Sequence, residues 1–375
     1  MQDPRVDRLA DLLTGYSLAL APGQVVRLDG EECAAPLLLA LYRSALLVGA
    51  HPYTNLEPEG VFEVLLAEGS DAQLERLAPS AWQEIEELDA YVTIWSERNT
   101  KGLSSVPPDR LGHRLAARKD HSRRRRERIA TGELRWCGTL FPTEAHAQDA
   151  EMTLEEYERF VFGACHVQEA GDASAHWRAT SASLTARAAE LGAVRELRVL
   201  GPDTDLRLGV AGRRWLPAEG RSNMPDGEIY TSPLETATQG EIRFAFPAVY
   251  EGREAEDVRL RFDGGEVVRA EARLGNDYLQ SLLAQDGARV LGEVAFGLNY
   301  EIDRFTRNIL FDEKIGGTMH FALGFGFPET GSEHLTAGIH WDMICDLREE
   351  GEVYADGELI WRAGRFLDDA GARDA

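Results

Sequence analysis

A change in hydrophobic pattern near residue 193 most constrains how this chain can fold. Before that point, β-rich runs at residues 24–30 and 51–58 flank a helical run at 32–50, and residues 90–99 form another strand-like run. Strands that alternate with helices in this way are typical of a parallel sheet. We therefore expect an α/β fold with a largely parallel sheet for the first part of the chain.

After residue 193, short β-rich runs follow one another directly. Asp263-Gly264-Gly265 and Asp356-Gly357 stand between such runs and indicate hairpin turns. We expect a mostly antiparallel β domain that contains one helix near residues 276–285. The expected strands are residues 195–201, 204–210, 241–246, 257–272, 309–311, 319–325 and 352–361.

The length of 375 residues suits two domains, each with its own core. We place the N-terminal α/β domain at residues 1–192 and the C-terminal domain at residues 193–375. Within the first domain, helical periodicity predicts helices over residues 5–19 and 71–87. Thr153 is a suitable N-cap for a further helix, because acidic residues follow it in the first turn.

Composition and charge exclude several classes of function. The formal net charge of −24 argues against nucleic acid as a partner, because phosphate binding requires a basic surface. The four cysteines are scattered without a CxxC pair, which indicates reduced thiols and a cytoplasmic protein. No apolar run reaches the roughly 18 residues that a membrane span needs, so we expect no membrane association. No dinucleotide or P-loop motif follows the first predicted strand.

Three candidate metal ligands lie in the later part of the C-terminal domain. His320, His340 and Asp342 offer two imidazoles and a carboxylate, a set that suits zinc, cobalt, manganese or ferrous iron. In a strand, His340 and Asp342 would share one face while Trp341 packs behind them. Taken alone, the three residues also match the ligand set of non-haem iron oxygenases.

Two glutamates extend this set of ligands. Glu228 and Glu293 each follow a glycine and precede β-type residues, so either side chain could point inward from a strand. A single glutamate of this kind more often lies at a surface strand edge. Together with the two histidines and the aspartate, however, they would form a two-metal site, in which one carboxylate bridges ions about 3.5 to 4 Å apart. Such a pair activates a hydroxide for hydrolysis and can hold a free α-amine, as an aminopeptidase requires.

Seven ordered blocks give the chain a resemblance to a known family. The blocks are SERNTKGLSSV (96–106), FPTEAHAQDAEMTLEEYERFV (141–161), GPDTDLRLGVAGRRW (201–215), NMPDGEIYTSP (223–233), GARVLGEVAFGLN (287–299), NILFDEKIGGTMHFALG (308–324), and PETG (328–331) with HWDMICDLR (340–348). Through these blocks the chain resembles the thermophilic-aminopeptidase family of metallopeptidases over nearly its whole length. The resemblance implies a hydrolase that releases amino-terminal residues from peptides with two divalent ions, which would be zinc, cobalt or manganese.

The resemblance also implies roles for single residues and for the domains. The metal ligands would be Glu228, Glu293, His320, His340 and Asp342, with Glu293 bridging the two ions. The resemblance further implies a homodimer whose active sites face an internal cavity and admit peptides with a free amino terminus. The N-terminal domain would then be the scaffold and dimerisation domain, and the C-terminal domain the catalytic one.

One position departs from the family's pattern. Seven residues after the first metal histidine, the family has a tyrosine that helps to stabilise the transition state, whereas this chain has Phe327. Phenylalanine cannot donate a hydrogen bond to an oxyanion, and losing one such donor typically costs about a hundredfold in turnover. Either another donor replaces it, such as a metal ion or Tyr300, or the site is retuned for a specialised amide or peptide substrate. In the second case, His334 of the altered loop would supply a new polar group.

Further alternatives concern the proton carrier and the class of protein. A glutamate that binds no metal, Glu313 or Glu329, could carry protons in place of Glu293. Ring-opening dioxygenases that use a single non-haem iron resemble the same scaffold. Such an enzyme would not need Glu228 or Glu293, so the presence of these two glutamates favours the peptidase. A non-catalytic binding protein would have no chemical reason to keep a costly cluster of carboxylates.

Overall fold

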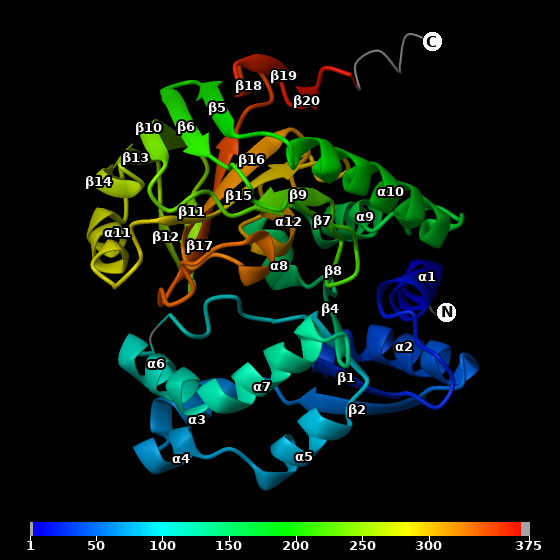
Figure 1. The fold of residues 1–375 in the computed structure, drawn as a ribbon. Helices are drawn as coiled ribbons and strands as arrows, with labels where there is room; N and C mark the ends of the chain where they lie inside the picture. Colours follow the sequence, from blue (N-terminus) through cyan, green and yellow to red (C-terminus); the bar gives the residue numbers. More distant parts are fainter. Residues whose placement is uncertain (1–2, 105, 369–375) are drawn as a thin grey trace. The chain divides into compact units, whose positions relative to one another are not determined.

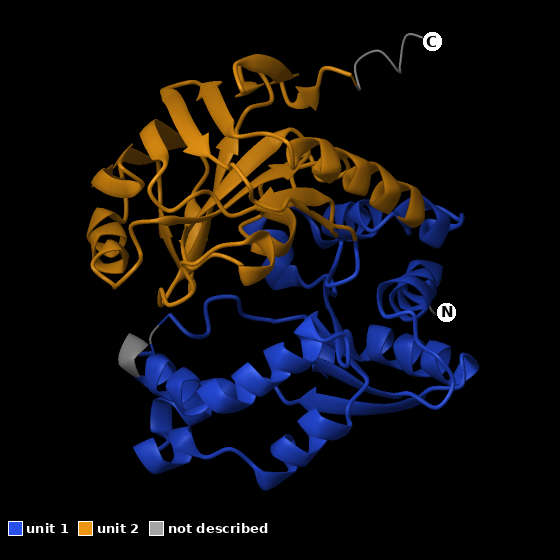
Figure 2. Ribbon diagram, viewed as in Figure 1, with its two compact units in different colours: residues 1–177, 220–225 blue, residues 178–219, 226–375 orange. Residues whose placement is uncertain are grey.

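A computed structural model describes residues 3–104 and 106–368 of the chain. The chain forms two compact units, drawn in different colours in Figure 2. Unit 1 comprises residues 1–177 and 220–225, and unit 2 comprises residues 178–219 and 226–375. Each unit has a hydrophobic core of its own.

Unit 1 is built on a five-stranded sheet with the order β2-β1-β3-β4-β8 (Figure 1). All neighbouring strands in this order are parallel. The predicted α/β fold with a parallel sheet is therefore confirmed. The strands are β1 (Val25–Glu31), β2 (His51–Glu57), β3 (Ala90–Trp95), β4 (Arg135–Leu140) and β8 (Asn223–Met224).

Helices connect the strands of unit 1. They are α1 (Pro4–Leu12), α2 (Ala35–Leu47), α3 (Val61–Glu68), α4 (Asp71–Glu75), α5 (Pro79–Glu87), α6 (Pro108–Ala117), α7 (Lys119–Ala130), α8 (Glu144–Asp149), α9 (Leu154–Ala164) and α10 (Ala173–Leu191), the last of which continues into unit 2. As predicted, Thr153 caps α9, because its side-chain oxygen accepts a hydrogen bond from the Glu156 N–H.

Two helices differ from the periodicity-based prediction. The helix expected over residues 5–19 ends as an α-helix at Leu12 and continues as a π-helical turn, Leu13–Ser17. The helix expected over residues 71–87 is two helices, α4 and α5. The helix already breaks at Arg76, which is extended with φ −70° and ψ 123°. Pro79 then starts α5 and keeps the preceding Ala78 out of the helical region, with φ −62° and ψ 136°.

Unit 2 consists mainly of antiparallel sheets, as predicted. One sheet has the order β14-β13-β10-β6-β5-β18-β19-β20, a second has the order β17-β16-β15-β9-β7, and β11 pairs with β12. The strands are β5 (Glu196–Gly201), β6 (Thr204–Gly209), β7 (Leu216–Ala218), β9 (Glu228–Thr231), β10 (Thr238–Phe244), β11 (Ala248–Tyr250), β12 (Arg253–Ala255), β13 (Val258–Asp263), β14 (Glu266–Glu271), β15 (Leu291–Gly297), β16 (Thr318–Gly324), β17 (His340–Asp346), β18 (Glu352–Ala355), β19 (Glu358–Arg362) and β20 (Arg365–Phe366).

One predicted strand of unit 2 is wrong. Residues 309–311 belong to the short helix α12 (Ile309–Asp312), which begins after Asn308. The Asn308 side chain accepts a hydrogen bond from the Leu310 N–H and so caps the helix. An apolar run of three residues carries too little periodicity to distinguish a strand from a helical turn. The other helix of this region, α11 (Asn276–Leu283), lies where it was predicted.

The sheet that contains β15, β16 and β17 separates the core of unit 2 from its polar side chains. Successive residues of a strand point to opposite faces. Residues of one face join the hydrophobic core; they are Val294, Phe296, Met319, Phe321, Leu323, Trp341, Met343 and Cys345. Alternation therefore directs Glu293, His320, His340 and Asp342 to the opposite face. Trp341 packs into the core behind its two polar neighbours, as predicted.

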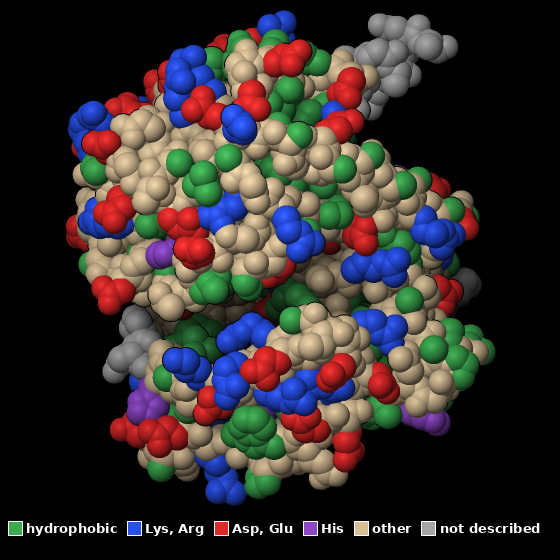
Figure 3. All heavy atoms as spheres, in the orientation of Figure 1, with side chains coloured by type: hydrophobic (Ala, Val, Ile, Leu, Met, Phe, Trp, Pro, Cys, Tyr) green, Lys and Arg blue, Asp and Glu red, His purple; other side chains and the backbone are tan. Residues whose placement is uncertain are grey.

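The surface of unit 1 carries charges of both signs. Figure 3 shows lysine and arginine side chains interspersed with acidic ones over the region of α7. Arg123 pairs with Asp120 and Glu127, and Arg124 pairs with Glu86. These two arginines of α7 are thus neutralised by acidic neighbours. Within the described residues, no helix is long and apolar enough to cross a membrane.

The aromatic cluster around Phe296 yields a prediction about stability. Phe296 is fully buried, and its ring lies 5.3 Å from Trp361 and 5.2 Å from Phe366. We expect Phe296→Ala to lower the free energy of unfolding by about 3 to 5 kcal/mol, because it removes these contacts and leaves a cavity. Urea denaturation followed by tryptophan fluorescence measures the change. Leu367→Ala, at a side chain that is 43% exposed, is the control and should cost far less.

Candidate metal centre

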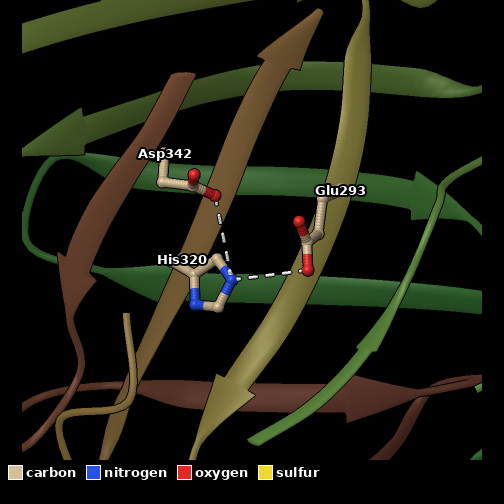
Figure 4. Close-up of side chains that lie close together, drawn as sticks. All are labelled: Glu293, His320 and Asp342. Carbon is tan, nitrogen blue, oxygen red and sulfur yellow. Dashed lines mark ion pairs between the residues drawn. The ribbon is translucent and has the colours of Figure 1, made fainter. Parts of the chain in front are cut away.

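Three adjacent strands bring the side chains of Glu293, His320 and Asp342 together (Figure 4). They come from β15, β16 and β17, and one ligand atom of each lies within 4.8 Å of the others. His320 Nε2 is 3.6 Å from Glu293 Oε1 and 3.9 Å from Asp342 Oδ1. Donors that share one ion through bonds of about 2.1 Å lie roughly 3 to 4 Å apart, so this spacing fits a metal ion.

Glu228 and His340 lie beside these three residues. Glu228, on β9, places its Oε2 atom 3.7 Å from His320 Nε2. His340, on β17, places its Nε2 atom 2.9 Å from Glu293 Oε2 and 3.7 Å from Asp342 Oδ1. The structure thus brings together all five side chains that the sequence proposed as metal ligands; we call them the five-residue cluster.

The carboxylates of the five-residue cluster are only partly compensated by the protein. In the described part of the chain, the buried atoms Glu228 Oε2 and Asp342 Oδ1 have no hydrogen-bond donor. Lys314 is fully buried nearby, where its ammonium forms an ion pair with Glu313 and lies 4.0 Å from Glu228 Oε1. Buried carboxylate oxygens without a donor need a cation. Together with the imidazole nitrogens, they form a donor set that suits a divalent metal.

Backbone carbonyls orient both histidines of the cluster. His320 Nδ1 donates to the Glu313 carbonyl over 2.8 Å, and His340 Nδ1 donates to the Phe325 carbonyl over 2.9 Å. Because these bonds use Nδ1, each Nε2 atom faces the carboxylates and could bind a metal. The Phe325 carbonyl lies close to Gly292, where a Cβ atom would be only 2.1 Å from the Phe325 oxygen.

The carboxylates hold protons on the imidazoles. Burial alone would lower the pKa of His320 and of His340, but the contacts with Glu293 and the charge of Asp342 outweigh burial and raise each pKa to about 10. Burial alone would also raise the pKa of Glu293, but the same two histidines lower it to about 2. Burial dominates at Asp342 and raises its pKa to about 6.

A cavity of about 310 Å³ opens beside His340 and Asp342. Its wall is mostly apolar and includes Val249, Phe305 and Ile309. All residues that line it belong to unit 2. The cavity gives a substrate room next to the five-residue cluster.

The structure places Phe327 against the cluster and directs the His334 ring to a backbone oxygen. The ring of Phe327 lies 5.1 Å from that of His340. His334 shares a 2.8 Å hydrogen bond with the Gly287 carbonyl. Of these two residues that the sequence proposed for the active site, Phe327 contacts a residue of the cluster, whereas His334 is hydrogen-bonded to the backbone.

Tyr230 and Lys314 also lie at the cluster, although the sequence did not single them out. Burial raises the pKa of the Tyr230 hydroxyl, and the charges of Glu293, Glu329 and Glu228 raise it further. The available signal for Tyr230 was its position two residues after Glu228 in a strand, which puts both side chains on one face. A lone lysine such as Lys314 carries no comparable signal.

Comparisons with known proteins point to one family of metallopeptidases. The model of the thermophilic metalloprotease (M29) family matches residues 2–366. Aminopeptidase T of Thermus aquaticus is 30% identical, with 93% of this chain and 88% of that protein covered. Aminopeptidase 2 of Geobacillus stearothermophilus is 26% identical, with 97% of this chain and 98% of that protein covered.

Solved structures are similar over the same extent. Wild-type AmpT from Thermus thermophilus superposes with a TM-score of 0.85 at 25% identity and covers 97% of this chain and 99% of its own. A 2,5-dihydroxypyridine dioxygenase from Pseudomonas putida KT2440 has a TM-score of 0.57 at 14% identity, with 97% and 96% covered. The second likeness concerns the fold alone.

The raised pKa values of His320 and His340 yield a prediction about metal binding. Because both values are about 10, each imidazole holds a proton between pH 6.5 and 8.5, and a metal must displace it. We expect Co²⁺ binding to release protons and to tighten with rising pH, by about tenfold per pH unit for each proton displaced. Calorimetric titrations in buffers of different ionisation enthalpy measure the released protons.

His113, a partly exposed histidine that pairs with Glu75 in unit 1, provides the control for this measurement, because His113→Ala should leave the proton release unchanged. Affinity that is independent of pH over this range would contradict the prediction.

Proposed function

Since this chain belongs to the thermophilic metalloprotease (M29) family, we propose that it is a metal-dependent aminopeptidase that binds two divalent ions. It releases amino-terminal residues from peptides. The observation that carries the proposal is the arrangement of Glu293, whose two carboxylate oxygens face different histidines. Oε1 lies 3.6 Å from His320 Nε2, and Oε2 lies 2.9 Å from His340 Nε2.

This arrangement supports a bridging role for Glu293. His320, Glu228 and Glu293 would hold one ion, and His340, Asp342 and Glu293 the other. In the described part of the chain, Glu228 Oε2 lacks a hydrogen-bond donor and lies 3.7 Å from His320 Nε2. Asp342 Oδ1 also lacks a donor and lies 3.7 Å from His340 Nε2 and 3.9 Å from His320 Nε2, within reach of either ion. We expect zinc, cobalt or manganese, because imidazole and carboxylate donors suit these metals.

Hydrolysis of the peptide adds a water oxygen to the scissile carbonyl carbon, breaks the C–N bond and delivers a proton to the leaving amine. Two bound ions would supply Lewis-acid chemistry, since such ions lower the pKa of water and polarise a carbonyl. The proton is carried by a carboxylate, which we assign to Glu293 or Glu329. Glu313 is less suited, because its carboxylate is engaged by Lys314.

The remaining aspects of the proposal concern assembly and location. We propose a homodimer in which residues 1–192 form the scaffold and dimerisation domain, while residues 193–375 form the catalytic domain. The peptide would bind with its free amino terminus at the five-residue cluster. We place the enzyme in the cytoplasm, because no disulfide joins its four cysteines, all of which lie in the described ranges.

Removal of the bridging carboxylate tests the proposal. We expect Glu293→Ala to abolish release of leucine from leucyl dipeptides, a loss beyond the hundredfold to thousandfold that one missing hydrogen-bond donor typically costs. Elemental analysis should show that the wild type binds two ions tightly and the variant does not. Glu358→Ala, on an exposed position of β19, is the control and should retain both properties. Two tightly bound ions in Glu293→Ala would reject the bridging assignment.

A ring-opening dioxygenase is the alternative, and a separate measurement distinguishes it. The cluster includes Glu228 and Glu293, which a single iron held by His320, His340 and Asp342 would not need. We therefore expect no oxygen consumption with dihydroxylated aromatic compounds. One iron per chain together with such consumption would reverse the assignment.

A further inference from the structure

Phe327 stands where the resemblance described above implies a transition-state tyrosine, so that hydroxyl must be dispensable or come from elsewhere. Tyr230 lies next to this position, since the rings of Tyr230 and Phe327 meet edge to face with centroids 5.4 Å apart. Phe327 in turn packs against His340 at 5.1 Å. Phe327 thus stands between Tyr230 and a residue of the five-residue cluster.

The sheet register puts Tyr230 on the face that carries the cluster. Tyr230 is two residues after Glu228 on β9, and residues with this spacing share a face. Across the sheet, Tyr230 is directly opposite Ala295 on β15, which is directly opposite His320 on β16. Directly paired residues of an antiparallel sheet also share a face. Because Ala295 carries only a methyl group, no bulky side chain stands between Tyr230 and His320 in this row.

The hydroxyl of Tyr230 is available to a substrate. Tyr230 is only partly buried, and in the described ranges its hydroxyl makes no hydrogen bond. Glu228, which belongs to the five-residue cluster, is two residues before Tyr230 on β9 and shares its strand face. A phenol is an ordinary hydrogen-bond donor at neutral pH. The group is therefore a donor without an assigned acceptor inside the metal centre.

Other candidate donors are already engaged. The Tyr300 hydroxyl donates to the Gly364 carbonyl over 3.0 Å. The His334 ring shares a hydrogen bond with the Gly287 carbonyl. Neither group lies in the sheet row that joins Tyr230 to His320.

We propose that Tyr230 is a catalytic residue that donates a hydrogen bond to the carbonyl oxygen of the scissile peptide bond as that oxygen becomes negative. It thereby supplies, from β9, the hydroxyl that Phe327 lacks. This inference rests on the proposed peptidase function. It also means that the substitution at residue 327 leaves the chemistry of peptide hydrolysis in place.

The test compares four variants with the wild type, each loaded with Co²⁺: Tyr230→Phe, Phe327→Tyr, the double variant Tyr230→Phe/Phe327→Tyr, and Tyr300→Phe. We expect Tyr230→Phe to lower kcat for leucyl-p-nitroanilide by about a hundredfold or more, with little change in KM. The double variant should recover at least about tenfold over Tyr230→Phe, because a hydroxyl returns on the neighbouring ring. Tyr300→Phe is the matched control and should retain wild-type turnover.

Binding measurements separate a catalytic role from a structural one. Leucine phosphonic acid is tetrahedral like the transition state, whereas leucine is a planar carboxylate product. We expect Tyr230→Phe to weaken binding of the phosphonic acid by at least about tenfold, while the affinity for leucine and the cobalt content stay unchanged. Equal losses for both compounds would indicate a structural role and would overturn the proposal.

Phe327→Tyr provides a readout that does not depend on the folding of Tyr230→Phe. If Tyr230 already donates, a second hydroxyl should raise kcat by less than about threefold. A rise of about a hundredfold would show that the wild type has no such donor and would reject the proposal. Tyr230→Phe with wild-type kcat, or loss of activity in Tyr300→Phe instead, would also reject it. A wild type that cleaves no peptide at all would instead disprove the proposed function.

Discussion

Buried negative charge on one face of a β-sheet is the constraint on which the arrangement of unit 2 depends. Glu228 and Glu293 are 6% and 5% exposed. Burial of a carboxylate costs several kcal/mol unless a positive group or a metal compensates it. The protein supplies part of this compensation through His320, His340 and the fully buried Lys314. The remaining need for positive charge is what makes the site selective for cations.

The same strands provide the burial that offsets this cost. On β15, β16 and β17, alternate residues join an aromatic and aliphatic core that includes Phe296, Phe321 and Trp341. The backbone hydrogen bonds of the sheet fix the register, and so they also fix which polar side chains face each other. A shift of one residue would exchange the two faces and place the carboxylates in the core. Packing and chemistry therefore depend on one register.

Several parts of this arrangement could be predicted from sequence because they rest on local rules. The HxD pattern at His340 and Asp342 indicates a shared strand face. Strands that alternate with helices indicate the parallel sheet, and strands that follow one another directly indicate the antiparallel ones. The distances within the five-residue cluster depend on pairing between strands far apart in the sequence, which periodicity does not contain. The same holds for Tyr230, whose contact with Phe327 joins residues nearly a hundred positions apart. Short elements such as α12 escaped prediction because the Asn308 cap, and not hydrophobic period, defines them.

Gly292 links the backbone to the metal centre in a way that the ligands alone do not reveal. A side chain here would press on the Phe325 oxygen, which orients His340. A homologue could therefore keep all five ligands and still be inactive, if it carries a larger residue at this place. A comparison that sorts related sequences into active and inactive enzymes must therefore consider the residue at position 292 as well as the five ligands.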